Sequence, residues 1–266
     1  MSAVSAEMRA GICARLQDIA RSEGVTILLA VESGSRAWGF HSPDSDYDVR
    51  FIYARPPEWH LRLEPGRDVI ERPISGDLDI SGWELSKALR LAMKSNAVLA
   101  EWLQSPITYL EDASARADLT GFAARVLDRR AVSWHYLSLA HRQSAQLRDP
   151  QGQVRLKRYF YCLRPALALR HMRLHGAAMV PMNMQALMAE TELPAAVTPW
   201  LNDLIAVKQA TGEMGVAAAT NPDCDALIAH EVAAARDWLA AGPARRTEPD
   251  WTAANELHLR WSQQGA

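Results

Sequence analysis

The stretch VESGSRAWGFHSPDSDYDVRFIY, residues 31–53, holds the features that decide the fold. A Gly-Ser pair, Gly34 and Ser35, follows the apolar run VTILLAV, which predicts a buried strand. About ten residues later, Asp46 and Asp48 lead into VRFIYA, a run with the β-branched and aromatic residues of a second strand. Aspartate is a poor strand former. Acids in this position break a local rule, which is a common mark of a functional site.

The composition limits the classes of protein to which the chain can belong. The chain has 266 residues, of which 48% are hydrophobic and 23% charged; this is typical of a globular protein with enough core for one large domain or two modest ones. Its three cysteines form no metal-ligand pattern and no even disulfide set, which favours a reducing compartment. No apolar run approaches the roughly 18 residues of a membrane span, and the N-terminal residues lack the core of a signal peptide. We therefore expect a cytoplasmic protein with no membrane partner.

Strand and helix patterns are segregated along the chain. Four strands are expected, all in the first third, near residues 25–31, 47–54, 68–72 and 77–80. Ser81 fits the cap of a following helix, with a glutamate three residues later. Helical patterns fill most of the rest, at residues 96–104, 133–147, 154–175, 184–189, 198–210, 225–240 and 252–263. We expect an α+β fold, with a mixed sheet and helices over residues 1–108 and an all-α domain over residues 109–266 that closes a cleft.

The acids in and near these strands suggest a metal site. Residues two apart in a strand project from the same face, so Asp46 and Asp48 aim two carboxylates at one point. A third acid, Asp79, lies between two apolar residues in GDLDIS. Asp77 would share its strand face and is the competing choice. Converging carboxylates repel one another without cations; Mg²⁺, or Mn²⁺ as an alternative, suits oxygen ligands. Two such ions about 3.5–4 Å apart are the usual clamp for attack on phosphorus.

The Gly-Ser turn fits a triphosphate. Gly34 permits close backbone approach, and Ser35 with the amides that follow can hold phosphate oxygens without a charged side chain. Arg36 adds a cation directly after the turn. A strand, a phosphate turn and paired carboxylates on the next strand predict a nucleoside triphosphate site with metal. It is not a P-loop, because no GKS or GKT is present.

A basic stretch adds a second set of candidates. Residues 129–176 contain ten Lys or Arg and a single acid, which favours a phosphate-bearing partner; the alternative is a face that neutralises acids elsewhere in the fold. Lys157, Tyr161 and Arg164 share one face of a predicted helix. We expect the two cations to hold triphosphate charge and the tyrosine to stack or hydrogen bond; the alternative is helix packing. Pro165 is expected to kink or interrupt this helix.

A family resemblance joins these features. GSRAWGFHSPDSDYDVRFIY resembles the signature of the DNA polymerase β-type nucleotidyltransferase superfamily. Residue by residue, the resemblance implies metal-binding carboxylates at Asp46, Asp48 and Asp79 and a phosphate-binding turn at Gly34 and Ser35. The stretches ESGSRAWGF, SDYDVRFIY, DLDISGW and KRYFYCLRPALALR resemble a bacterial family associated with RNA-repair operons, sometimes called RlaP-like, over the chain to about residue 210.

These features predict a metal-dependent nucleotidyltransferase. It would move an NMP from an NTP to an acceptor hydroxyl or phosphate and release pyrophosphate. Asp46 and Asp48 would hold two metal ions, and Asp79 would bind the ion near the nucleophile and act as general base. The resemblance and the basic stretch favour an RNA end as acceptor over a protein or a small molecule, although the chain has no aromatic-basic RNA module. The alternatives are a catalytically silent nucleotide-binding protein and a metal-dependent phosphohydrolase or nuclease that uses the same carboxylates.

Overall fold

The chain folds into two compact units. The computed structural model describes residues 3–64, 66–148, 150–211, 216–217, 220–242 and 248–264. The first unit comprises Met1–Ala37, Asp46–Leu127 and Thr247–Ala266, and the second comprises Trp38–Ser45 and Asp128–Arg246. The first unit therefore extends past residue 108, where the sequence predicts a boundary, and includes the C-terminal helix.

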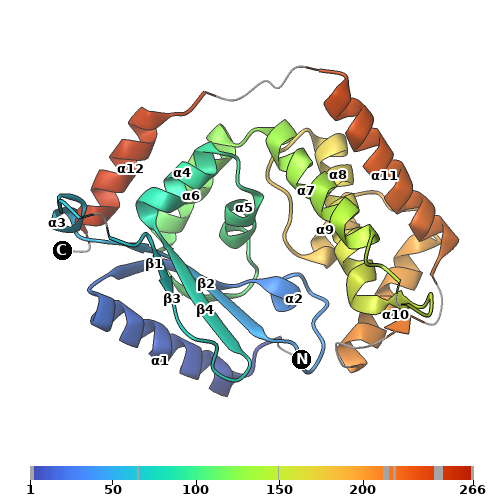
Figure 1. Cartoon of the computed structure of the whole chain (residues 1–266), viewed down its shortest axis with the longest axis horizontal. Helices are drawn as coiled ribbons and strands as arrows, with labels where there is room; N and C mark the ends of the chain where they lie inside the picture. The colour runs from blue at the N-terminus through green and yellow to red at the C-terminus, as the bar shows by residue number, and fades with distance from the viewer. Residues whose placement is uncertain are drawn as a thin grey trace. The chain divides into compact units, whose positions relative to one another are not determined.

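The first unit is a mixed α+β structure (Figure 1). Its elements are α1 (Ala6–Glu23), β1 (Thr26–Glu32), α2 (Gly34–Ala37), β2 (Tyr47–Ala54), α3 (Pro57–His60), β3 (Val69–Glu71), β4 (Leu78–Glu84), α4 (Leu85–Met93), α5 (Ala97–Leu103), β5 (Thr108–Glu111), α6 (Ala113–Val126) and α12 (Trp251–Gln263).

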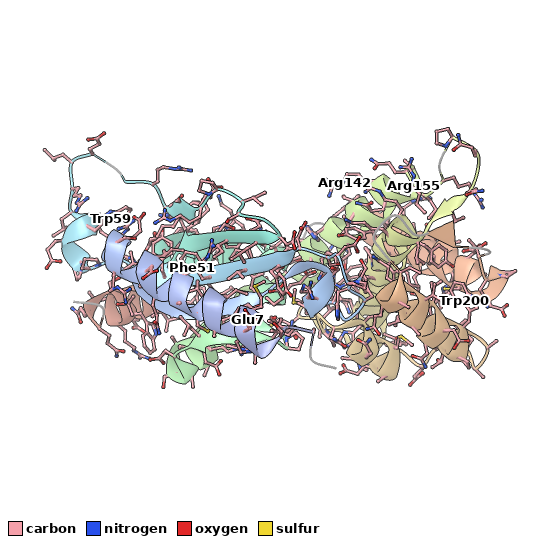
Figure 2. All side chains as sticks on the ribbon, turned by 90° about the horizontal axis from the view of Figure 1, so that it is seen from below. Glu7, Phe51, Trp59, Arg142, Arg155 and Trp200 are labelled. Carbon is pink, nitrogen blue, oxygen red and sulfur yellow. The ribbon has the colours of Figure 1, made fainter. Side chains whose placement is uncertain are left out.

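The five strands form one sheet in the order β3-β4-β2-β1-β5. Strands β2 and β4 are parallel, and the other neighbours are antiparallel. One face buries Val49 and Phe51 of β2 against Ile12 and Leu16 of α1; Phe51 is labelled in Figure 2. Asp48 and Arg50 alternate with these buried residues and therefore point to the other face. The alternation of side chains along β2 therefore determines which acids lie on the same face of the sheet.

Most predicted strands are confirmed, with two corrections. Strand β2 has the predicted bounds. The predicted helix start at Ser81 is wrong, because residues 81–84 pair with residues 50–53 of β2 and β4 continues to Glu84. The ladder hydrogen bonds outweigh the local capping signal, and the Glu84 side chain caps α4 instead by accepting the Ser86 amide. Strand β5 and helix α6 were not predicted, so strands are not confined to the first third.

Where the structure describes it, the second unit is helical apart from one short strand pair. Its elements are α7 (Arg129–Ser144), β6 (Val154–Arg155), α8 (Leu156–His175), α9 (Met184–Glu190), α10 (Val197–Ala210), β7 (Val216–Ala217) and α11 (Pro222–Ala240). Helix α8 contacts both α7 and α11 and buries most of its length. It runs through Pro165, so the predicted interruption is wrong. Within the described part of the chain, no helix combines the length and hydrophobicity that a bilayer crossing requires.

Candidate active site

The turn after β1 lies directly against a carboxylate of β2. Gly34 opens α2 with φ +57°, a left-handed conformation that favours glycine. A Cβ at this position would lie 2.0 Å from Asp48 Oδ2. The Ser33 amide donates to the Asp48 carbonyl over 2.8 Å, which fixes the turn to β2. Both the conformation and the close approach therefore require glycine at position 34.

Two of the three predicted carboxylates converge. In the parallel pair of β2 and β4, Asp48 lies opposite Asp79. Their side chains are 31% and 34% exposed, so solutes can reach both. Arg50 Nη2 bridges them, at 3.0 Å from Asp48 Oδ1 and 2.7 Å from Asp79 Oδ2. The residues that flank Asp79, Leu78 and Ile80, are buried, as their alternation with it predicts. This pair forms the centre of the candidate site.

The outer acid of each strand lies just before the strand begins. Asp46 and Asp77 are both exposed, and each precedes the first residue of its strand, Tyr47 of β2 or Leu78 of β4. The Asp77 carbonyl accepts the Tyr47 amide over 2.7 Å, which joins the two strand starts. Asp46 lies two residues from Asp48, and its role as a metal ligand stays a prediction.

Arg36 has structural partners in the first unit. It is 6% exposed, and its guanidinium lies 3.8 Å from the centre of the Tyr47 ring. Its Nε donates to the Asp46 carbonyl over 3.1 Å, and Nη1 donates to the Ala3 carbonyl over 2.7 Å. Arg36 thus ties α2 to the residue before β2. To contact a triphosphate, as the sequence predicts, it would have to leave these partners.

Sequence reasoning missed a buried acid behind the site. Glu32, the last residue of β1, is fully buried. Its Oε1 accepts the Asp48 amide over 2.8 Å, and its Oε2 accepts the hydroxyl of Tyr109 from β5. Burial raises the pKa of Glu32 from 4.5 to about 7. The signal in the sequence was an acid that directly follows an apolar run and precedes the Gly-Ser turn.

In the second unit, two of the three predicted α8 residues pack on one tryptophan. Arg164 is 2% exposed; its guanidinium lies 4.8 Å from the Trp38 ring centre and its Nε donates to the Met182 carbonyl over 3.1 Å. The Tyr161 ring meets the Trp38 ring edge-on, with centres 5.3 Å apart. Lys157 is half-buried one turn earlier. Trp38 directly follows α2 in the sequence, but contact of these residues with a triphosphate stays a prediction.

Three cations of the basic stretch have partners in or just after α11 of the second unit. Arg170 and Arg173 both pair with Glu231 of α11, which is almost fully buried. Although burial acts in the opposite direction, these two ion pairs hold the pKa of Glu231 below its usual value. Arg130 donates to carbonyls at the end of α11. The charge imbalance of the stretch is therefore weaker evidence for a phosphate-bearing partner. These three cations already have partners within the chain, more than 50 residues further along it.

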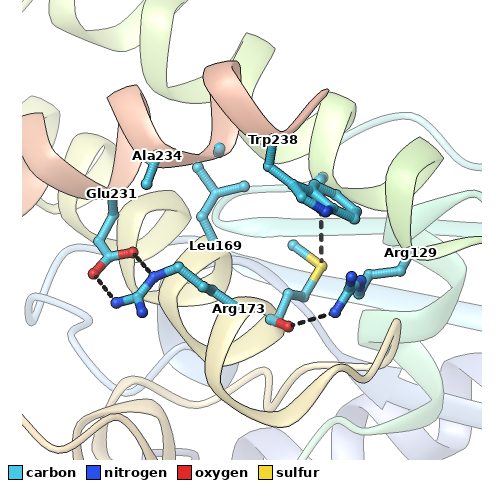
Figure 3. A pocket seen from close by; sticks show the side chains of 9 residues that line it. Arg129, Leu169, Arg173, Glu231, Ala234 and Trp238 are labelled. Atoms are coloured by element: carbon cyan, nitrogen blue, oxygen red, sulfur yellow. Dashed lines mark hydrogen bonds and ion pairs between the residues drawn. The ribbon is translucent and has the colours of Figure 1, made fainter. Parts of the chain in front are cut away.

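A cavity lies beside the ion pair of Arg173 and Glu231 (Figure 3). Its volume is about 150 Å³, and its lining includes Arg129, Arg173, Glu231 and Trp238. The Arg129 guanidinium stacks 4.4 Å from the Trp238 ring and donates to a backbone carbonyl of α8. None of the predicted site residues lines this cavity.

Comparison with known proteins assigns the chain to a family. The profile of the RNA repair pathway DNA polymerase beta family, RlaP, matches residues 8–260. The chain belongs to this family. The resemblance drawn from the Gly-Ser turn and the aspartates is thereby confirmed. The chain is also 47% identical to the uncharacterized protein YcgL of Bacillus subtilis over 192 residues, which cover 71% of this chain and 73% of that protein.

A search of solved structures found a nucleotidyltransferase-like protein from Exiguobacterium sibiricum. The match covers 86% of this chain and 75% of that one, with 10% sequence identity and a TM-score of 0.30. The family assignment therefore rests on the sequence match. The α+β class rests on the mixed sheet and the helices described above.

Proposed function

We propose that the chain is a metal-dependent nucleotidyltransferase, which moves an NMP from an NTP to an acceptor and releases pyrophosphate. The observation that carries the proposal is the in-register pair of Asp48 and Asp79, with the Gly34 turn in contact with Asp48. Membership in a polymerase-β-type family supports the same reaction class. Two carboxylates beside a glycine turn suit a substrate that carries both phosphate and metal.

The donor set fits magnesium. Asp48 and Asp79 offer carboxylate oxygens at one point, and both pair with the Arg50 guanidinium. A positive charge is therefore already stabilised at this position. We assign Mg²⁺, with Mn²⁺ as an alternative, to Asp48, Asp79 and Asp46. When bound, the ions would lower the pKa of the attacking hydroxyl and polarise the phosphoryl oxygens.

The remaining roles follow from position. Asp79 accepts the proton of the acceptor hydroxyl, since its carboxylate is accessible on the face where the acids meet. The backbone of Gly34 and Ser35 binds the terminal phosphates. Glu32 holds the Asp48 amide and Tyr109, and so fixes the backbone that carries the first carboxylate.

The acceptor that we favour is an RNA end, since the family description names an RNA repair pathway. Arg142, Arg148 and Arg155 of the basic stretch are exposed and suit phosphate contacts (the first and last are labelled in Figure 2). A phosphohydrolase or nuclease with the same carboxylates, and a silent nucleotide-binding protein, are the competing functions.

Separate incubations with α-labelled and γ-labelled NTP, Mg²⁺ and cellular RNA and protein distinguish these functions. A transferase places the α label in the RNA or protein fraction and the γ label in pyrophosphate. A phosphohydrolase releases free nucleotide from the NTP and leaves both fractions unlabelled. A nuclease shortens the RNA and leaves the NTP intact, and a silent binder changes neither. Asp79→Asn should abolish transfer, whereas the matched variant Asp77→Asn, which removes an exposed acid outside the strand, should retain it. Retained transfer in Asp79→Asn would contradict the proposal.

A further inference from the structure

Three side chains from distant parts of the sequence meet at the other end of β4. They are His60 at the end of α3, Glu84 at the end of β4 and His258 in α12, all within the first unit. One potential ligand atom from each lies within 4.8 Å of the other two. His60 Nε2 is 3.7 Å from Glu84 Oε1, and the two imidazole rings meet edge-on with centres 4.5 Å apart.

Each of the three side chains has one buried polar atom without a hydrogen-bond partner in the described part of the chain. Within the described residues, His60 Nε2, Glu84 Oε1 and His258 Nε2 have no hydrogen-bond partner. Glu84 is fully buried, and a buried polar atom without a partner is normally costly. The other carboxylate oxygen, Oε2, accepts both the amide and the hydroxyl of Ser86. These bonds fix the carboxylate so that Oε1 remains directed at the histidines.

We propose that His60, Glu84 and His258 form a Zn²⁺ site. Two imidazole nitrogens and one carboxylate oxygen are an established donor set for zinc, and imidazole donors favour zinc over Mg²⁺. Zinc–ligand bonds of about 2.0–2.2 Å separate tetrahedral ligands by roughly 3.3–3.6 Å. The His60–Glu84 distance of 3.7 Å is already close to this range, and a ligand atom of His258 lies within 4.8 Å of both partners.

The site is separate from the candidate active site and does not depend on the proposed function. Asp79 and Glu84 lie on the same strand but five residues apart, so their side chains project from opposite faces. The rise of an extended strand separates them by roughly 17 Å. An ion held by Glu84 would instead join α12 to α3 and β4. Helix α12 contacts α3, α4 and α6, so the metal would fix α12 to the rest of the first unit.

Co²⁺ titration of the untagged full-length protein tests the site. We expect one Co²⁺ per chain, with the visible absorption bands of a tetrahedral site, and displacement by one equivalent of Zn²⁺. His60→Gln and His258→Gln should each weaken binding at least 100-fold and remove the rise in melting temperature that Zn²⁺ gives the wild type. His230→Gln is the matched control, because His230 is an exposed histidine of the second unit.

Two results would overturn the site. One is the absence of stoichiometric Co²⁺ binding to the wild-type protein, which would leave a protonated histidine–glutamate ion pair as the explanation. The other is undiminished binding in the histidine variants. If His258→Gln does not fold, His60→Gln decides the matter, because His60 is partly exposed at the end of a four-residue helix.

Discussion

Replacing Gly34 by alanine should disable the candidate site through one steric contact. The new Cβ would lie 2.0 Å from Asp48 Oδ2 and 2.9 Å from its Cγ. The carboxylate must rotate away, which breaks its 3.0 Å ion pair with Arg50 and displaces a proposed metal ligand. The φ of +57° adds about 1–2 kcal/mol of strain for alanine. We expect Mg²⁺–NTP affinity to fall at least tenfold, which corresponds to about 1.4 kcal/mol.

Gly24→Ala separates the contact from the strain. Gly24 has nearly the same φ, +59°, but a Cβ added there would have no atom within 4 Å outside its own neighbourhood. The variant should lose similar folding stability and keep its nucleotide affinity. Isothermal titration with Mg²⁺ and a non-hydrolysable NTP, together with denaturant unfolding, measures both quantities on each variant. Wild-type affinity in Gly34→Ala, or an equal loss in Gly24→Ala, would refute the reasoning.

Three further variants probe the surroundings. Folding raises the pKa of Glu32 from 4.5 to about 7. The stabilising contribution of Glu32 is therefore present below about pH 4.5 and lost as the pH rises through 7. In denaturant unfolding, Glu32→Gln should remove up to about 3 kcal/mol of the pH dependence of the unfolding free energy. Arg50→Ala leaves Asp48 and Asp79 without their shared cation, so its melting temperature should fall in EDTA and recover with Mg²⁺; no recovery would count against a metal site. Arg164→Ala should lower the melting temperature because it removes a buried, packed guanidinium. If Arg164 makes the proposed triphosphate contact, the variant should also bind NTP roughly tenfold more weakly. Unchanged NTP affinity would remove Arg164 from the site.

The central acids could be predicted from the sequence because they depend on local periodicity. Asp48 and Asp79 each alternate with apolar residues, and a period of two assigns them to a face without knowledge of any partner. The Gly-Ser turn likewise carries its own conformational signal in Gly34. What the pattern could not supply was the pairing of β2 with β4, which places the two acids opposite each other.

The features that sequence reasoning missed depend on contacts between distant residues. Glu32 is a buried acid because Tyr109, 77 residues later, reaches its carboxylate. Arg170 and Arg173 of the basic stretch pair with an acid that the local charge pattern leaves out, because Glu231 lies far beyond the stretch. Ser81 reads locally as a helix cap, yet its pairing with β2 keeps it in a strand. In each case a long-range partner outweighs the local pattern.

Binding of Mn²⁺ in the presence of a non-hydrolysable NTP, followed by electron paramagnetic resonance, tests the central claim without knowledge of the acceptor. The wild type should bind two Mn²⁺ ions per chain in a nucleotide-dependent manner. Asp48→Asn and Asp79→Asn should each lose this binding, while Asp77→Asn, which removes the same charge from an exposed position, should keep it. Unchanged nucleotide-dependent Mn²⁺ binding in both Asp48→Asn and Asp79→Asn would contradict the account.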